Sequence, residues 1–598
     1  MWIDDAAVHR TGDFTCIAAG AIFLALFAAL AVKLKDVQLD NSASLAYDGE
    51  RQSVRSVRMA GERGRILAAD GTVLAANLPV REITLDTTAF QKRTWEDTAA
   101  NMMSAIERAA AVIGRKGDVD LADIEKHIRR KLALPLTVWR NVTDEELARF
   151  AEHFELLPGF ECEEKLVRTY PQGALAAHAI GYVGRDRMDF GEGERAFHYV
   201  DFEMRGRGGL EVRYDSFLRG MPGERNIVVD ARGFARDERM VVEPQKGPDL
   251  VLALDMALQR ACEAQLEGVS GACAVLDPRD GSVLAIASSP AFDLNRFVPS
   301  IPKALWDEFA EDPAKRMLNR AISGSYAPGS TFKPVTALAG LKAGLSPRAA
   351  YECTGAYRLG KMSIRCSHQW GHWPSVLDMN QALKESCNPY FCDFATRAGT
   401  NAVITAARAL GLGAKTGIDL PGEAAGVVPD AEWKRLNWHE KWYPGDLPQM
   451  AIGQGMLLAT PLQMAALAGA IGVGYLAVPH MKAGEQPEVK AIPFAKWQLD
   501  TVREGMRSVV KSGTGKRAGA GLAVEVAGKT GTAEVGRGAS RRKNVWFIAY
   551  APAKNPTLAL AIVIENGDTG GSTAAPRARE ILKARFGEAP PGGERSGV

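Results

Sequence analysis

The longest apolar run in the chain lies close to the N-terminus. Residues 14–32 (FTCIAAGAIFLALFAALAV) carry no charge, and 19 such residues in a helix are long enough to cross a bilayer. A cleaved signal peptide usually has a shorter apolar core of about 7–15 residues and a small-x-small cleavage site, which the following AVKLKD lacks. We therefore predict an uncleaved, single-pass anchor within residues 1–37, although the few flanking Lys and Arg residues do not fix its orientation.

Residues 38–250 mix short strand and helix patterns. In RGRILAADGTVLAAN two alternating apolar runs flank Asp70-Gly71, a strong turn dipeptide, and this predicts a β-hairpin. In TAANMMSAIERAAAVI apolar residues recur three and four positions apart, which predicts helix within 95–155. From 160 onward strand patterns alternate with Gly-rich turns such as GRGGLEVRYD. We expect an irregular α+β domain without a catalytic constellation.

A second domain is predicted for residues 251–586. It begins with a strand that turns into a helix, followed by a hairpin in GACAVLDPRDGSVLAIASSP, while helical patterns dominate 300–480. Strand patterns return in VEVAGKTG and NVWFIAYAP. Strands at both ends with helices between them are typical of an α+β domain whose first and last strands share one sheet. The Pro/Gly-rich tail, 587–598, is predicted to be disordered.

The charge balance and the cysteine content of the chain both bear on its function. The 598 residues include 73 basic and 71 acidic side chains, which gives a net charge of +2. This balance offers no bulk attraction for a polyanion, so nucleic acid is not an expected partner. Four of the eight cysteines fall within 353–392, and free thiols outside the cytoplasm are at risk of oxidation.

The first candidate site lies in SYAPGSTFKPVTALAGL. Ser330 follows a Pro-Gly break and opens a predicted helix, so Lys333 shares its helical face. A lysine amine whose pKa is lowered by partial burial can take the proton of a neighbouring serine hydroxyl. The start of the helix also offers backbone N–H groups where an oxyanion would form. This pair predicts an activated serine nucleophile.

The second motif is Ser386-Cys387-Asn388, which lies 56 residues after Ser330. A serine and an amide two positions apart, just before Pro389, suit a helix-to-loop corner that points both side chains into a cleft. A capping serine and a turn asparagine would give the same tripeptide, so this motif alone is weak.

The third motif is Lys529-Thr530-Gly531-Thr532, between VEVAG and AEVG. It offers a cation and two hydroxyls for a substrate carboxylate, and Gly531 leaves room for a substrate backbone. Chance matches to these short patterns occur elsewhere, in less suitable settings: Ser300/Lys303, Ser508/Lys511, Lys415-Thr416-Gly417 and Lys511-Ser512-Gly513.

Together and in this order, the three motifs resemble the active site of penicillin-recognising serine enzymes. Longer stretches, among them NRAISGSYAPGSTFKP, AIGQGMLLATPLQMA and GRGGLEVRYDSFLRGMPG, resemble class B penicillin-binding proteins, and most of all the elongation-type penicillin-binding protein 2. The resemblance implies a transmembrane helix, a non-catalytic pedestal of dimerisation type, and a C-terminal transpeptidase domain with an antiparallel sheet and a helical subdomain. It also implies a place in the inner membrane with the bulk of the chain in the periplasm.

The same resemblance implies a role for each motif residue in peptidoglycan cross-linking. Ser330 attacks the D-Ala-D-Ala carbonyl of a stem peptide, Lys333 takes its proton, and a second stem peptide then attacks the acyl-enzyme. Ser386 relays a proton to the leaving amine, and Asn388 holds the amide side of the substrate. The residues implied in binding the substrate carboxylate are Lys529, Thr530 and Thr532. β-Lactams would acylate the same serine and inhibit the enzyme.

A cysteine cluster departs from the plain serine-enzyme pattern. Cys353, Cys366, His372 and Cys387 form a Cys₃His set that suits tetrahedral zinc, although their spacing is not that of a zinc knuckle. The resemblance to penicillin-binding protein 2 supports a structural Zn²⁺ that braces the middle motif. A Cys353–Cys366 disulfide or three free thiols are the alternatives, His368 is a substitute ligand, and Cys392 is expected in the core.

Other members of the penicillin-recognising group are alternatives to an elongation-type transpeptidase. A division-type transpeptidase would carry the same motifs, whereas a D,D-carboxypeptidase or β-lactamase would not need an anchor and a large pedestal. A non-catalytic β-lactam sensor or scaffold would tolerate loss of the motif lysines, yet both are present. The resemblance further implies a SEDS-type membrane glycosyltransferase as partner and no organic cofactor.

Overall fold

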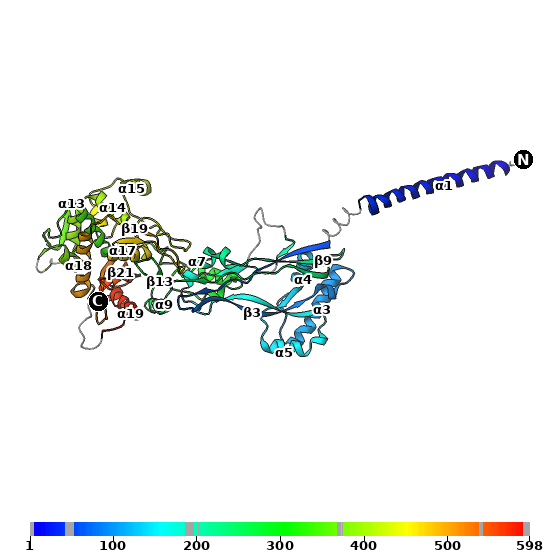
Figure 1. The fold of residues 1–598 in the computed structure, drawn as a ribbon, viewed down its shortest axis with the longest axis horizontal. Coiled ribbons are helices and arrows are strands. Elements are labelled where there is room, and N and C mark those ends of the chain that lie inside the picture. The colour runs from blue at the N-terminus through cyan, green and yellow to red at the C-terminus, as the bar shows by residue number, and fades with distance from the viewer. Residues whose placement is uncertain are drawn as a thin grey trace.

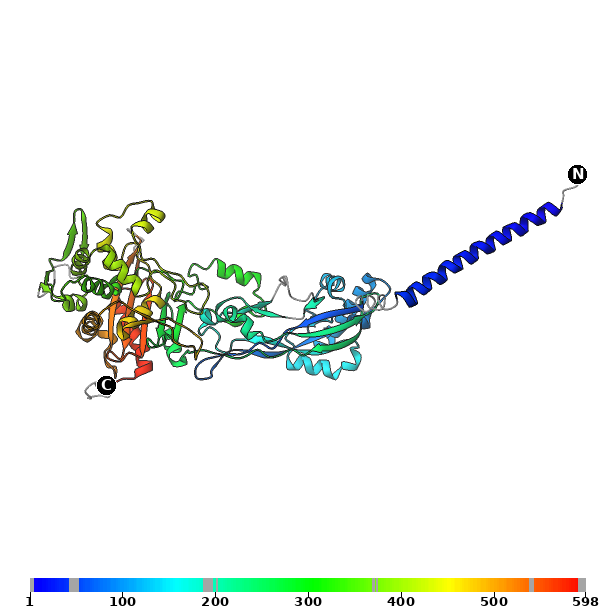
Figure 2. The same cartoon turned by 45° about the horizontal axis from the view of Figure 1, so that its top comes forward.

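The computed structural model describes residues 5–41, 53–185, 197–200, 203–367, 372, 375–536 and 542–589. The molecule is elongated, with helix α1 (Asp5–Lys35) at one end, a slender pedestal domain in the middle and a larger domain at the other end (Figures 1 and 2). Most of the tail predicted to be disordered lies outside the described residues, which end at 589.

Helix α1 packs against no other part of the described chain. It continues as the short π-helix η1 (Asp36–Asp40), and Cys16–Asp40 is the single stretch within the described residues that is long and apolar enough to cross a membrane. Its side chains are exposed, as for Phe23 at 75% and Phe27 at 71%. A bilayer would cover such a surface, so the structure agrees with the predicted anchor.

Two sheets form the pedestal. The first has the order β10-β9-β1-β7, with the bounds β10 (Ala235–Val242), β9 (Gly223–Val229), β1 (Val54–Met59) and β7 (Tyr199–Val200). The second has the order β11-β2-β3-β4, and β5 also pairs with β3: β11 (Leu250–Val251), β2 (Ile66–Leu67), β3 (Val73–Leu85), β4 (Leu136–Trp139) and β5 (Phe160–Thr169).

The hairpin predicted around Asp70-Gly71 is confirmed. Ile66 of β2 lies opposite Ala75 of β3, and Gly71 takes the positive φ of 83° that the turn requires. Strand β3 runs on to Leu85, further than the sequence pattern indicated. Because the middle of β3 is exposed on both faces, its sequence does not show the alternation of apolar and polar residues that would have predicted a longer strand.

Three helices cover one end of the pedestal: α3 (Trp95–Ile113), α4 (Leu121–Lys131) and α5 (Asp144–Glu152). On α3 the buried side chains include Met102, Ile106, Ala109 and Ile113, the three-and-four spacing from which helix was predicted. Strand β4 separates α4 from α5, so the predicted helical segment is interrupted. Short elements lie towards the larger domain: β6 (Val183–Arg185), β8 (Met204–Gly206), α6 (Ala177–Ile180), α7 (Gly209–Arg213) and α8 (Asp215–Leu218).

A five-stranded antiparallel sheet is the centre of the larger domain. Its order is β13-β12-β22-β21-β20, with the bounds β13 (Val283–Ser289), β12 (Gly271–Leu276), β22 (Leu558–Ile564), β21 (Arg542–Ala551) and β20 (Ala527–Val535). Because β12 pairs with β22, the expectation that the first and last strands share a sheet is confirmed. Strand β20, which carries the third motif, forms one edge.

Both faces of this sheet are buried, and alternate residues of each strand face opposite cores. On β21, Phe547 belongs to the core beside α9 (Met256–Ala264) and α19 (Ala575–Phe586), whereas Trp546 belongs to the core beside α17 (Pro461–Val473). The remaining helices are α10 (Lys303–Ala310), α11 (Lys333–Lys342), α12 (Met379–Lys384), α13 (Asn388–Ala398), α14 (Thr400–Ala409), α15 (Ala431–Trp438), α16 (Asp446–Ala451) and α18 (Lys496–Ser512).

Candidate active site

The turn that carries Ser330 is clamped against the edge of the sheet. Gly329 has φ 56°, and Gly329–Phe332 forms a 3₁₀ turn (η5) that leads into α11. The Gly329 N–H donates to the Gly453 carbonyl at 2.8 Å. A Cβ at Gly531 would lie 2.8 Å from the Pro328 carbonyl oxygen, so only glycine allows β20 to approach this closely. Ser330 is thus held half-buried beside the third motif.

Lys333 is fully buried and points at the second motif. Its Nζ donates to the Ser386 carbonyl oxygen at 2.5 Å, to Ser386 Oγ at 3.1 Å and to Asn388 Oδ1 at 2.7 Å. Burial lowers the pKa of Lys333 to about 8. Among the described contacts Lys333 and Ser330 share no hydrogen bond, so the direct contact suggested by their spacing is not made in this state.

Ser386 occupies the corner between two helices, as the tripeptide predicted. It follows α12 and has φ 58°, a left-handed conformation that is uncommon for a non-glycine residue and is often found at functional sites. Asn388 begins α13, and its Nδ2 donates to the Arg365 carbonyl at 2.8 Å. The corner therefore fixes both side chains towards Lys333.

Lys529 approaches the same serine hydroxyl from the sheet. Its Nζ donates to Ser386 Oγ at 2.9 Å and to the Thr530 carbonyl at 2.9 Å. Burial, together with the nearby charge of Lys333, moves the pKa of Lys529 well below its usual range. Two buried amines thus share one hydroxyl, an arrangement that favours a neutral amine at neutral pH.

Thr530 and Thr532 extend the site along β20. Thr530 Oγ1 lies 2.7 Å from Thr514 Oγ1, and the Gly570 N–H donates to Thr532 Oγ1 at 3.2 Å. Thr514 and Gly453 both contact the site, and sequence reasoning assigned neither. The short SGTG segment after α18 and the GQG segment after α16 are the signals that would have marked them.

The chance copies of the motifs lie in other settings. Lys303 begins α10, Lys511 and Ser512 end α18, and the Lys415 copy forms a loop in which Thr416 donates its hydroxyl to Glu423 at 2.6 Å. The structure therefore brings Ser330 together with the motifs at 386 and 529, whereas the chance copies lie elsewhere.

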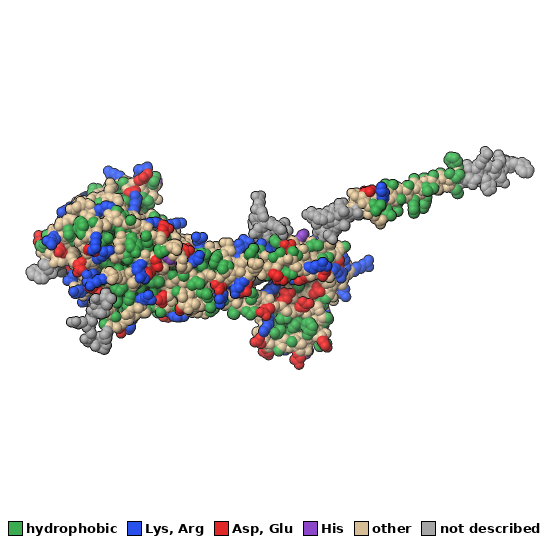
Figure 3. Space-filling view, viewed as in Figure 1, with side chains coloured by type: hydrophobic (Ala, Val, Ile, Leu, Met, Phe, Trp, Pro, Cys, Tyr) green, Lys and Arg blue, Asp and Glu red, His purple; other side chains and the backbone are tan. Residues whose placement is uncertain are grey.

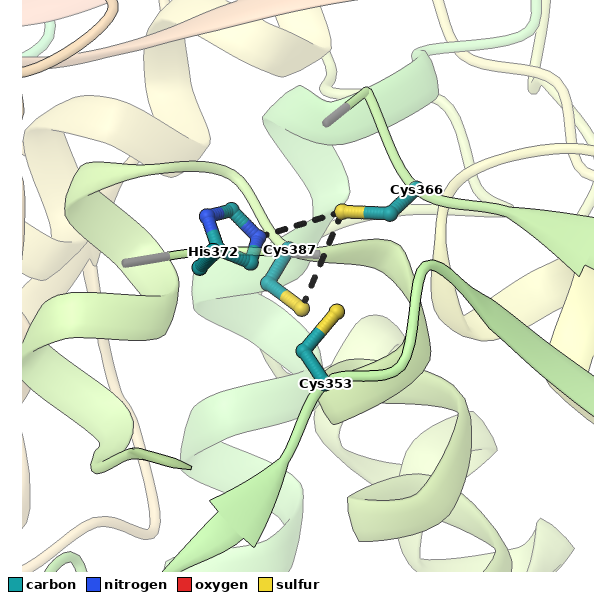
Figure 4. Close-up of side chains that lie close together, drawn as sticks. All are labelled: Cys353, Cys366, His372 and Cys387. Atoms are coloured by element: carbon teal, nitrogen blue, oxygen red, sulfur yellow. Dashed lines mark hydrogen bonds between the residues drawn. The ribbon is translucent and has the colours of Figure 1, made fainter. Parts of the chain in front are cut away.

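The predicted Cys₃His set converges next to this site (Figure 4). The ligand atoms of Cys353, Cys366, His372 and Cys387 lie within 4.8 Å of one another. Cys366 Sγ is 3.1 Å from His372 Nε2 and 4.0 Å from Cys387 Sγ. Tetrahedral zinc, with bonds of about 2.0–2.3 Å, places its ligand atoms about 3.5 Å apart, so the donor set fits that ion.

The electrostatics of the cluster also suit a cation. The adjacent Cys366 thiol and burial raise the pKa of Cys387, and burial raises the pKa of Cys353. Three thiols packed together cannot ionise unless a positive charge joins them. Cys392 lies in the core, as expected, and contacts the Pro448 carbonyl. His368, Trp370 and Trp373 lie outside the described residues.

The cluster is joined directly to the catalytic corner. Cys387 stands between Ser386 and Asn388, and the carbonyl of Arg365, the neighbour of Cys366, accepts from Asn388 Nδ2. Any group that ties Cys366 to Cys387 would therefore hold the amide of Asn388 in place.

Comparisons with known proteins show the family to which the chain belongs. Residues 271–583 match the model of the penicillin binding protein transpeptidase domain, and residues 58–252 match that of the penicillin-binding protein dimerisation domain. The chain belongs to the penicillin-binding protein transpeptidase family. The predicted family and the α+β architecture are thereby confirmed.

Individual relatives are similar over nearly the whole chain. The peptidoglycan D,D-transpeptidase MrdA of Acinetobacter baumannii is 32% identical, over 93% of this chain and 85% of the relative. The solved complex between penicillin-binding protein PBP2 and MreC from Helicobacter pylori superposes with a TM-score of 0.77 at 27% identity, covering 89% of this chain and 98% of that one. A structure described as coordinating polymerization and crosslinking in a peptidoglycan synthase complex gives a TM-score of 0.72 at 28% identity, covering 97% and 98%.

Proposed function

We propose that this protein is a peptidoglycan D,D-transpeptidase of the elongation type that works through an acyl-enzyme on Ser330. The observation that carries the proposal is the Ser386 hydroxyl, which receives hydrogen bonds from two fully buried lysines beside Ser330. Such uncompensated burial keeps an amine available as a base near neutral pH. The name of the Acinetobacter relative supports this reaction.

In the first half-reaction Ser330 Oγ attacks the carbonyl carbon of the D-Ala-D-Ala bond while its proton passes to Lys333. The backbone N–H groups of Ser330 and Thr532 bind the resulting oxyanion. The C–N bond then breaks, and a proton relayed from Lys333 through Ser386 reaches the leaving amine, so that free D-Ala departs. The distance of 3.1 Å between Lys333 Nζ and Ser386 Oγ supports this relay.

In the second half-reaction the amine of a neighbouring stem peptide attacks the Ser330 ester. Its proton passes through Ser386 to Lys333, the C–O bond to Ser330 breaks as the new amide bond forms, and Lys333 returns the proton to the Ser330 oxygen. Strand β20 is an edge strand, so an extended stem peptide has backbone groups to pair with. Thr530 and Thr532 offer hydroxyls to the substrate carboxylate, while Lys529 holds Ser386 Oγ from behind through a hydrogen bond of 2.9 Å.

Labelling with fluorescent penicillin tests the nucleophile. Ser330→Ala should keep the wild-type melting temperature and lose all labelling, whereas Ser508→Ala, the matched change in a chance Ser-x-x-Lys copy, should label normally. Full labelling of Ser330→Ala would show that Ser330 is not the nucleophile. A persistent adduct is expected on the wild type; rapid release of hydrolysed drug would instead identify a β-lactamase.

We further propose that Cys353, Cys366, His372 and Cys387 hold a structural Zn²⁺, whose charge would stabilise the thiolates and fix the segment around Asn388. Metal analysis should find one zinc per chain, and Cys366→Ser should release it and lower the melting temperature. Less than half a zinc per chain together with a Cys353–Cys366 disulfide in peptide mapping would reject this site.

We also propose that α1 anchors the protein in the inner membrane with the remaining chain in the periplasm, and that a SEDS-type glycosyltransferase is its partner. The exposed apolar helix supports the anchor, and the likeness to the peptidoglycan synthase complex supports the partner. Co-purification of the full chain from membranes, followed by mass spectrometry of the captured glycosyltransferase, tests this; recovery without any such protein would contradict it.

A further inference from the structure

The end of the pedestal next to the anchor carries an exposed basic surface. Lys and Arg side chains gather there in Figure 3, at the end where α1 joins the pedestal in Figure 1. We call it the basal patch, and its members, all exposed, are Lys92, Arg93, Arg129, Arg130, Lys131, Arg232 and Arg236.

Three separate segments are fixed together to make the basal patch. Arg232 lies in the turn between β9 and β10, and its Nη2 donates to the Lys92 carbonyl at 2.6 Å. At the end of α4, the Leu132 carbonyl accepts from Thr87 Oγ1 at 2.6 Å. A Cβ at Gly233 would lie 3.4 Å from the Leu132 side chain, so the end of α4, with its three consecutive cations, lies next to the turn that carries Arg232.

Acidic neighbours only partly neutralise the patch. Asp230 pairs with Arg236 at 2.6 Å, and Glu125 lies 3.8 Å from Arg129. Glu96 and Asp97 are exposed at the start of α3. Among the described residues, the basic members of the patch outnumber these acidic neighbours, and such a surface attracts anions over about 8–10 Å at ordinary ionic strength.

An exposed tryptophan lies at the edge of the patch. Trp95 is 42% exposed, and the Arg232 guanidinium carbon lies 5.4 Å from the centre of its ring. The ring also stacks on Phe234, with the centroids 5.7 Å apart, and the Arg232 guanidinium carbon lies 5.5 Å from the centre of the Phe234 ring as well. Tryptophan beside cations is typical of protein surfaces that meet the headgroup layer of a membrane.

The anchor keeps this surface close to the membrane. Eleven residues, 42–52, join the described end of the anchor segment to the pedestal, and even fully extended they span no more than about 40 Å. Strand β1 begins at Val54, opposite Val228, so the chain enters the pedestal beside the β9–β10 turn that carries Arg232. A short tether gives a high effective concentration, and weak contacts then suffice.

We propose that the basal patch binds the anionic phospholipid headgroups of the membrane that α1 crosses. Binding of the patch to the membrane fixes the orientation of the pedestal and thereby sets the distance between the active site and the bilayer. The proposal rests on α1 being a membrane anchor and does not depend on the chemistry at Ser330.

Hydrogen exchange of the full chain in nanodiscs tests the proposal. One set of discs contains only phosphatidylcholine, and the other contains equal parts of phosphatidylcholine and phosphatidylglycerol. We expect slower exchange of the segments 91–95, 129–133 and 230–236 in the anionic discs at low salt, and loss of this protection in about 1 M salt, where charges are screened within about 3 Å.

Charge-reversal variants distinguish the contribution of the basal patch to lipid binding from that of other basic residues. In Arg129→Glu/Arg130→Glu/Lys131→Glu the protection should fall at least about tenfold, because each basic residue near an anionic surface contributes about fivefold to binding. The control Arg435→Glu/Lys441→Glu/Lys490→Glu, which reverses three exposed cations of the larger domain, should keep it. Unchanged exchange of the buried face of α3 shows that the pedestal of each variant is folded, and normal penicillin labelling shows the same for the larger domain.

Two results would overturn the proposal. Equal exchange of the three segments in both kinds of disc would show that anionic lipid does not bind them. Protection that appears only after a partner membrane protein is added, and that is independent of lipid charge, would assign the patch to a protein interface instead.

Discussion

The pedestal and the larger domain each contain a cluster of buried side chains that can carry charge. The two clusters differ in whether groups of opposite charge lie beside them. In the pedestal Arg63 and Arg168 are buried against the fully buried carboxylate of Glu211, at 2.7 Å in each case. In the active site Lys333 and Lys529 are equally buried, yet their recorded partners are hydroxyl, amide and carbonyl oxygens. Arg63 also pairs with Asp215 at 2.8 Å, so two guanidinium groups face two carboxylates and the charge of the first cluster is balanced. Among the described residues, the second cluster has no carboxylate partner.

The difference separates a structural site from a chemical one. A balanced pair keeps its ordinary charge and stiffens the fold, because removing one partner leaves the other buried and unpaired. An unbalanced amine gives up its proton easily, so its pKa falls into the range where it can act as a base. Lys333, with a pKa of about 8, is of the second kind.

The largest effect is expected from Lys333→Met. Loss of the base should reduce the rate of acylation by penicillin about 10²–10⁴-fold. Stability should stay the same or rise, because an uncompensated buried charge is removed. Stopped-flow labelling and thermal unfolding measure the two effects. Lys342→Met, at the exposed end of the same helix, is the matched control and should label at the wild-type rate.

Glu211→Gln should lower stability and leave the acylation rate unchanged, the opposite of what is expected for Lys333→Met. It leaves the buried Arg168 guanidinium without a carboxylate partner and Arg63 with Asp215 alone, so the free energy of unfolding should fall by about 3–5 kcal/mol. The acylation rate of the molecules that remain folded should be unchanged. Glu145→Gln, which breaks an exposed pair with Arg149 on α5, should change stability by less than about 1 kcal/mol. Equal losses in the two variants would refute the contrast drawn here.

A smaller effect is expected at Thr514. Its hydroxyl lies 2.7 Å from that of Thr530, and one hydrogen bond contributes about 1 kcal/mol, or about fivefold in a rate or affinity. Thr514→Val should weaken the apparent binding of penicillin by about that factor with little change in the maximal acylation rate. Thr514→Ser should restore binding, and a failure to do so would remove Thr514 from the site.

Much of this picture could be predicted from the sequence because the chemistry lies in short local patterns. The Pro-Gly break before Ser330, the corner at Ser386 and the strand setting of Lys529 each appear where the patterns place them. The length of β3, the contacts of Thr514 and Gly453, and the pairing of Arg63 and Arg168 with Glu211 could not be predicted. They depend on residues brought together over long sequence separations, which local periodicity does not record.

The central claim is that a buried, unbalanced amine activates Ser330, and the pH dependence of acylation tests it most directly. Burial lowers the pKa of Lys333 below that of a free lysine, so its neutral form is scarce at low pH and grows as the pH rises through about 8. The rate of Ser330 labelling should therefore increase towards a plateau with an apparent pKa near that value. The unfolded chain holds this proton up to about pH 10.5, so stability should also rise between those two values. A labelling rate that is flat across this range, or that falls as Lys333 loses its proton, would contradict the account.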